Sequence, residues 1–84
     1  MVEQITVYRG CKIHTVVRSG EGGVLQAECT VEPTTMSAAE SVTKRHAVLE
    51  FQASKMANPE VAALEAAATD IRQWVDFRFE DRDA

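Results

Sequence analysis

The chain contains few of the residues on which common small-protein functions depend. Its 84 residues include only two cysteines, one tryptophan and one tyrosine. Two cysteines do not make the disulfide framework of a small secreted domain, so we expect free thiols in a reducing cytoplasm. The first residues lack the pattern of a signal peptide, and no apolar run is long enough to cross a membrane. The sequence therefore predicts one cytoplasmic domain over residues 1–84, without membrane association.

Positive charge is scarce as well. Thirteen acidic residues stand against nine basic ones, and the net charge of −4 arises entirely from residue 58 onward. Because phosphate contacts supply most nucleic-acid affinity, we do not expect an acidic chain without a basic run to bind nucleic acid. The alternative function is a nucleic-acid-associated regulatory protein with a local basic patch, made of Lys12, Arg18, Lys44 and Arg45.

Patterns typical of catalysis and of metal binding are missing. Gly20, Gly22 and Gly23 lie in a strand-to-strand turn with no helix after it, so they do not form a phosphate loop. There is no Cys-x-x-Cys motif, and no histidines and acids stand at metal-ligand spacing. Cys11 and His14 alternate to opposite faces of one strand and cannot act as nucleophile and base. The sequence thus predicts a protein that is not an enzyme, with no catalytic, cofactor or metal site and no small-molecule substrate.

Three segments near the start alternate apolar and polar residues with the period of a strand: 3–8, 11–18 and 24–31. A three-residue loop at Tyr8-Arg9-Gly10 would pair Val7 with Cys11 and keep the apolar residues of both strands on one face. A two-residue turn at Arg9-Gly10 would instead pair Tyr8 with Cys11. We expect the first arrangement, because a one-residue slip moves every side chain to the other face.

The second loop lies at residues 19–23, and its length sets how the two cysteines meet. A loop of three residues would place Cys11 opposite Cys29, whereas a loop of five would place Cys29 opposite Ile13. In both cases the thiols face the core, where free cysteine acts as a small hydrophobe. The solvated face of the sheet is expected to carry His14, His46, Thr6, Tyr8 and Val16.

The segment after Pro33, which ends the third strand, fits two patterns. Ser37 and Glu40 have the spacing of a capping box, and a helical spacing continues from Ala39 to Met56. Residues 46–53 also alternate as a strand, and they contain Val48 and Phe51. We expect a fourth strand at 46–53, with at most a short helical turn at Ser37.

A helix is predicted over residues 59–79. Asn58 is its N-cap, Pro59 takes the first helical position, and the acids after residue 79 should fray its end. The core stripe is expected to consist of Val61, Leu64, Ala68, Ile71 and Val75, with Ala67 and Trp74 at its edge. The fold class is therefore α+β, an antiparallel four-stranded β-meander packed on one C-terminal α-helix in the order ββββα.

Several of these signals occur together in one group of proteins. Tyr8-Arg9-Gly10 with Ile13, a glycine-rich turn, and Asn58-Pro59-Glu60 leading to Arg72-Gln73-Trp74-Val75-Asp76 make the chain similar to short uncharacterised bacterial proteins. Those proteins share the plan of a β-meander followed by one C-terminal helix, and residues 32–45 depart from their pattern. The resemblance implies the fold and the fourth strand, and it implies no activity or site.

The helix carries a second stripe, opposite the core stripe, that suggests an interface. Small residues allow another helix to approach closely, and a helix facing only water rarely carries a phenylalanine there. We expect a non-enzymatic protein-protein interaction module that binds an unknown partner or a second copy. The candidate interface consists of Ala62, Ala66, Thr69, Gln73 and Phe77. If the helix ended before Phe77, that side chain would fold onto the core instead.

Overall fold

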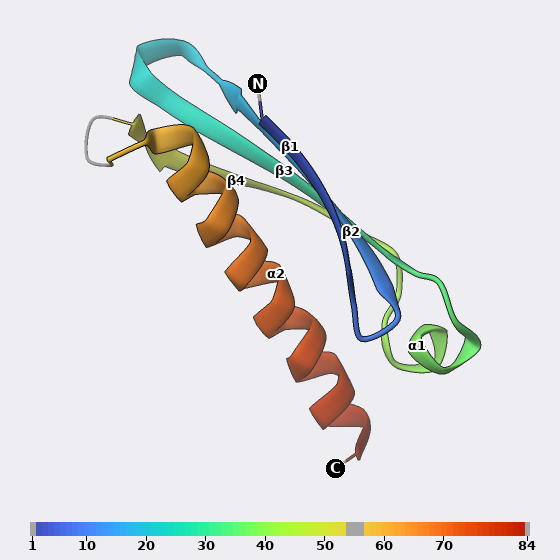
Figure 1. Cartoon of the computed structure of the whole chain (residues 1–84). Helices are drawn as coiled ribbons and strands as arrows, with labels where there is room; N and C mark the ends of the chain where they lie inside the picture. The colour runs from blue at the N-terminus through green and yellow to red at the C-terminus, as the bar shows by residue number, and fades with distance from the viewer. Residues whose placement is uncertain (1, 54–56, 84) are drawn as a thin grey trace.

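The computed structural model describes residues 2–53 and 57–83, and it has the predicted α+β architecture. Four antiparallel strands form one open sheet in the order β1-β2-β3-β4, and helix α2 crosses one face of it (Figure 1). Every strand boundary lies within two residues of its expected position. The elements are β1 Val2–Tyr8, β2 Cys11–Ser19, η1 Glu21–Gly23, β3 Val24–Pro33, α1 Met36–Ser41, β4 Arg45–Gln52 and α2 Pro59–Asp83.

The first hairpin has the two-residue turn, so the expected three-residue loop was wrong. Tyr8 pairs with Cys11 and Ile5 pairs with His14. Arg9 and Gly10 have φ angles of 50° and 75°, the two positive values that a type I′ turn requires. The turn geometry thus fixes the register, against the apolar pattern of β1.

This register reverses the expected faces of β1. Thr6 and Tyr8 pair with Ile13 and Cys11 and therefore face α2, not the open side of the sheet as predicted. Ile5 and Val7 lie on the open face and are 54% and 72% exposed. Because β1 is an edge strand, burying Ile5 and Val7 against the helix would have added little to the stability of the fold. That small gain does not outweigh the register that the turn prefers.

The second hairpin places Cys29 opposite Thr15, so both of the expected cysteine pairings were wrong. The turn between the strands contains η1, in which Gly22 and Gly23 take positive φ angles. Both cysteines nevertheless face the helix and are buried, as expected. Cys11 instead pairs with Pro33, the residue at which β3 ends.

Helix α2 packs on the sheet through two alanines and two larger apolar residues. Ala63 and Ala67 are fully buried, together with Ile71 and Val75. Leu64, Ala68 and Trp74 are half-buried around this contact, but Val61 is 51% exposed and is not part of the core. The buried positions recur every four residues from Ala63 to Val75, and Val61, two residues before Ala63, lies on another side of the helix.

The helix continues to Asp83, beyond the expected end near residue 79. Acidic residues at a helix C-terminus cost about 0.3–1 kcal/mol each when exposed. Contacts of Asp76 and Phe79 with Arg9 of the first turn hold the last part of α2 against the sheet and offset that cost.

The segment between β3 and β4 contains the short helical turn, but its cap is not Ser37. The side chain of Thr35 accepts a hydrogen bond from the backbone N–H of Ala38 and caps α1. Ala38 and Val42 are buried and close one end of the core. Gly10 joins this segment to the first hairpin, because its carbonyl oxygen accepts from both the N–H and the hydroxyl of Thr34 at 2.8 Å.

We expect Gly10→Ala to destabilise the protein more than Gly22→Ala. Both glycines have positive φ, where an alanine costs roughly 1–2 kcal/mol. A Cβ at Gly10 would also lie 2.9 Å from Oγ1 of Thr35, whereas one at Gly22 meets nothing within 4 Å. Urea unfolding of the two variants measures the difference, and equal losses would show that the α1 contact is unimportant.

Candidate functional site

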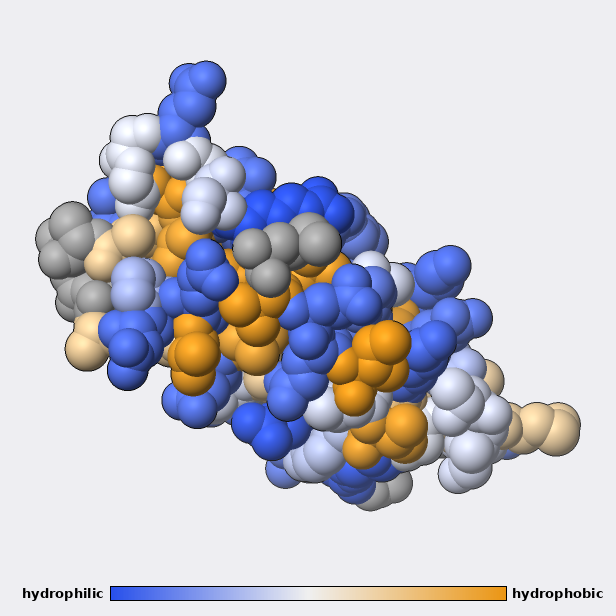
Figure 2. All heavy atoms as spheres, turned by 45° about the horizontal axis from the view of Figure 1, so that its top comes forward, coloured by the Kyte–Doolittle hydropathy of each residue, from blue (hydrophilic) through white to orange (hydrophobic). Residues whose placement is uncertain are grey.

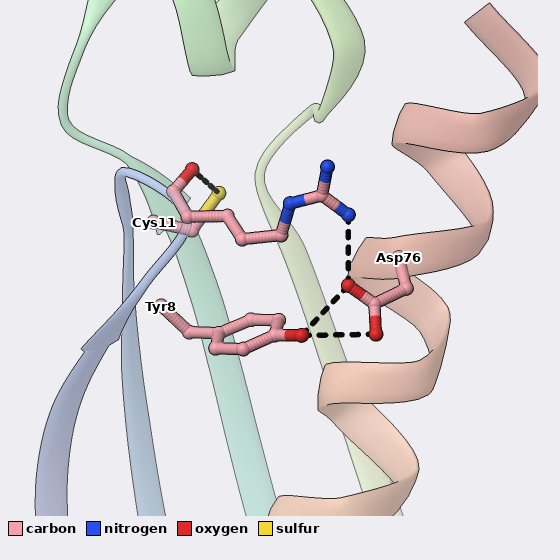
Figure 3. Close-up of polar contacts among 4 residues, drawn as sticks. Tyr8, Cys11 and Asp76 are labelled. Carbon is pink, nitrogen blue, oxygen red and sulfur yellow. Dashed lines mark hydrogen bonds and ion pairs between the residues drawn. The ribbon is translucent and has the colours of Figure 1, made fainter. Parts of the chain in front are cut away.

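A polar cluster joins the first turn to the C-terminal half of α2 (Figure 3). The Tyr8 hydroxyl donates to the Asp76 carboxylate, whose two oxygens lie 2.7 and 2.9 Å away. Arg9 donates from Nη1 to Oδ1 of Asp76 at 2.9 Å, and its guanidinium lies 4.3 Å from the centre of the Phe79 ring. The Cys11 thiol lies 3.9 Å from the carbonyl oxygen of Arg9. The contacts of Tyr8 and Arg9 with α2 fasten the hairpin to the helix.

The cluster shifts the acidity of two of its members in opposite directions. The hydrogen bond from Tyr8, followed by that from Arg9, holds the pKa of Asp76 below its ordinary value of 3.8. The same hydrogen bond, made by the neutral phenol to the carboxylate, raises the pKa of Tyr8 above 10.0. At pH values between the lowered pKa of Asp76 and the raised pKa of Tyr8, the ionised carboxylate and the neutral phenol stabilise each other. We call these contacts among Tyr8, Arg9 and Asp76 the latch, because they hold the first turn against α2. The expected register turned Tyr8 away from the helix, so the latch was not predicted from the sequence.

Beside the latch, a hollow of about 180 Å³ runs between edge strand β1 and helix α2. Its lining is apolar at Ile13 and Ala68, and the Glu65 carboxylate and the Arg72 guanidinium lie on its helix side. Arg72 donates from Nε to the carbonyl oxygen of Ala68 at 3.2 Å. The lining consists of Gln4, Thr6, Val7, Tyr8, Ile13, Glu65, Ala68 and Arg72. We call this the β1–α2 groove.

The open face of the sheet carries both histidines, as predicted. His46 lies 2.7 Å from Glu28, which also accepts from Arg18 at 3.0 Å. The hydrogen bond with His46 is the main reason why the pKa of Glu28 is lowered. His14 lies 3.3 Å from the carboxylate of Glu3. Within the described residues no three or more histidines, cysteines and acids form a group that could hold a metal ion.

The four basic residues of the alternative function are not brought together. Arg18 is paired with Glu28, and six positions along β2 separate it from Lys12. Arg45 lies on the other face, with its guanidinium 4.7 Å from the centre of the Trp74 ring. Lys44 is exposed in the segment before β4. No continuous basic surface results from these positions.

The predicted interface lies on the outward face of α2. Ala66, Thr69, Gln73 and Phe77 are exposed, and Ala62 is half-buried. Phe77 belongs to the continuous helix and is 60% exposed, so it does not fold onto the core. Phe79 takes that place instead, packed against the core beneath Arg9.

Other large apolar side chains are exposed as well. Figure 2 shows one face of the molecule, where hydrophobic side chains lie in separate groups between hydrophilic ones. Three of the exposed residues, Ile5, Val7 and Val48, belong to the sheet, and their exposure ranges from 51% to 72%. In the described part of the chain no helix is long and apolar enough to span a membrane.

Comparison with known proteins identifies no relative. No family model matches the chain, and neither a curated protein nor a solved structure is significantly similar to it. The resemblance to short bacterial proteins therefore stays a prediction.

We expect Tyr8→Phe to lower the free energy of unfolding between about pH 4 and pH 10. The contribution of Asp76 is present above its ordinary pKa and is lost as pH falls through the lowered value, while that of Tyr8 is lost as pH rises through its raised value. Removing the hydroxyl should also move the pKa of Asp76 upward. Urea midpoints over pH 2–11 and carboxylate NMR titration measure both effects. A stability difference that did not shrink at acid pH would contradict the latch.

Both thiols should resist labelling in the folded protein. Cys11 and Cys29 are at most 1% exposed, and burial is the main cause that raises the pKa of each. A thiol reagent near pH 8 should therefore label two groups rapidly in denaturant and neither rapidly in buffer. Equal rates in the two conditions would show that the core opens readily.

Proposed function

We propose that this protein is a non-enzymatic protein-protein interaction module that binds a partner through the outward face of α2. The observation that carries the proposal is Phe77, which is 60% exposed within a continuous helix. Fully burying a phenylalanine side chain stabilises a protein by roughly 1.5–3 kcal/mol, and the part of that gain that belongs to the exposed surface of Phe77 is available to a partner. Aromatic residues are enriched in protein interfaces for this reason.

The residues around Phe77 favour a helical or flat partner. Ala66, Thr69 and Gln73 precede it at helical spacing and have short or flexible side chains. Short side chains let another backbone approach closely, and none of these residues carries a charge that would have to be desolvated. We also propose a cytoplasmic location, in keeping with two cysteines that are both free.

The proposal is tested by photo-crosslinking from the interface in cells. A photoreactive phenylalanine analogue at Phe77 should form an adduct with a specific partner, whereas the same analogue at Val61 should not. Val61 is a matched control because it is 51% exposed on the same helix but lies outside the interface.

Binding of the purified partner should then weaken at least tenfold in Phe77→Ser, because truncation of a central aromatic anchor commonly costs more than about 1.4 kcal/mol. Val61→Ser should bind like the wild type. Equal crosslinking from both positions, or full binding by Phe77→Ser, would refute the use of this surface.

A further inference from the structure

Strand β1 is an edge of the sheet that lacks the usual protection against pairing. Natural edges are blunted by charges, prolines or bulges. The five residues Gln4-Ile5-Thr6-Val7-Tyr8 carry no charge and no proline, and four of them are β-branched or aromatic. The opposite edge, β4, carries Arg45, His46 and Glu50. The two edges of the sheet therefore differ in how readily they accept another strand.

The backbone N–H and C=O groups of β1 are also oriented to pair with another strand. In a two-residue hairpin the residues that close the turn, here Tyr8 and Cys11, form a hydrogen-bonded pair. Hydrogen-bonded and non-bonded pairs alternate along an antiparallel ladder, so Glu3, Ile5 and Val7 direct their N–H and C=O groups away from β2. In the described residues β2 is the strand with which β1 pairs, and the outer side of β1 has no partner strand.

The β1–α2 groove beside this edge is self-complementary in charge. β1 and α2 run in the same direction along it (Figure 1). Glu65 and Arg72 are both exposed, line the groove, and lie two helical turns apart. A second helix lying antiparallel across the groove would bring its arginine opposite Glu65 and its glutamate opposite Arg72.

We propose that two copies of this chain associate by antiparallel pairing of β1 with β1, about a two-fold axis that passes beside Thr6. The axis is perpendicular to the sheet, so an eight-stranded sheet forms with both α2 helices on one face. Ile5 then lies opposite Val7 of the second copy on the open face, and both belong to the set with outward backbone groups. Glu65 of each copy faces Arg72 of the other. Each contact occurs twice, as in any isologous interface.

The association rests on contacts that the isolated chain leaves unmade. Pairing satisfies the outward backbone groups of Ile5 and Val7 in each copy and covers their side chains, the most exposed apolar pair of the sheet. The outward face of α2 takes no part in it. The dimer therefore goes beyond the proposed function, and either can fail without the other.

Sedimentation equilibrium over a range of concentrations tests the dimer. The wild type should reach twice the chain mass of 9.3 kDa as concentration rises. Ile5→Pro removes an outward N–H without breaking the β1–β2 ladder and should abolish the dimer. Ile5→Lys should weaken it roughly 2- to 30-fold through its two lost cross-strand pairs. Circular dichroism confirms that each variant is folded.

Val48→Lys is the matched control for Ile5→Lys. Val48 is on the same open face and is 51% exposed, but it belongs to β4. Pairing through the β1 edge predicts that Val48→Lys dimerises like the wild type. Equal weakening by both lysines would show that two sheets stack face to face and would overturn the proposal.

Charge reversal tests the proposed contact across the groove. Arg72→Glu and Glu65→Arg should each weaken the dimer roughly 2- to 30-fold, and the double variant should recover the wild-type constant. A monomeric wild type at all concentrations, a dimer unaffected by Ile5→Pro, or a double variant as weak as the single ones would overturn the proposal. Loss of the dimer in Phe77→Ser would show that self-association uses α2 and would overturn the proposal. Loss of partner binding alone in the same variant would leave the β1 dimer intact.

Discussion

The turn at Arg9-Gly10 is the constraint on which the rest of the structure depends. Its two positive φ angles fix the register of the first hairpin and so decide which face of β1 meets the helix. Tyr8 then reaches Asp76 on α2, and Gly10 accepts two hydrogen bonds from Thr34 ahead of α1. Three parts of the chain that are distant in sequence are thus held at one turn.

The elements themselves were predictable because each has a local signature. Alternation marks the strands, Pro33 ends β3, and the Asn58-Pro59-Glu60 cap starts α2. The registers were not predictable from the same signals. The apolar residues Ile5 and Val7 favour the other register, but an edge strand that the helix covers only in part gains little from burying them. The hairpin loops therefore decided both registers.

The candidate sites show the same division between local and tertiary information. The outward stripe of α2 with Phe77 follows from helical periodicity, and its exposure agrees with that pattern. The latch and the β1–α2 groove depend on which face of β1 meets α2, which only the correct register reveals. The prediction for Val61 was wrong because the buried positions recur every four residues from Ala63 to Val75, and Val61 is not one of them. The buried position at this end of the helix is taken by the small Ala63 and not by the large apolar Val61.

The latch joins Tyr8 to Asp76, which is 68 residues later in the chain, and this separation matters during synthesis. Strands β1 to β4 pair only with their sequence neighbours, so the meander can form as soon as its residues leave the ribosome. The helix that covers its inner face is made after all four strands. For that interval the nascent sheet exposes Cys11, Ile13 and Val31 together with the bare edge of β1. The Tyr8–Asp76 contact can form only after α2 has been made, so the turn that is synthesised first is secured by one of the latest contacts to form.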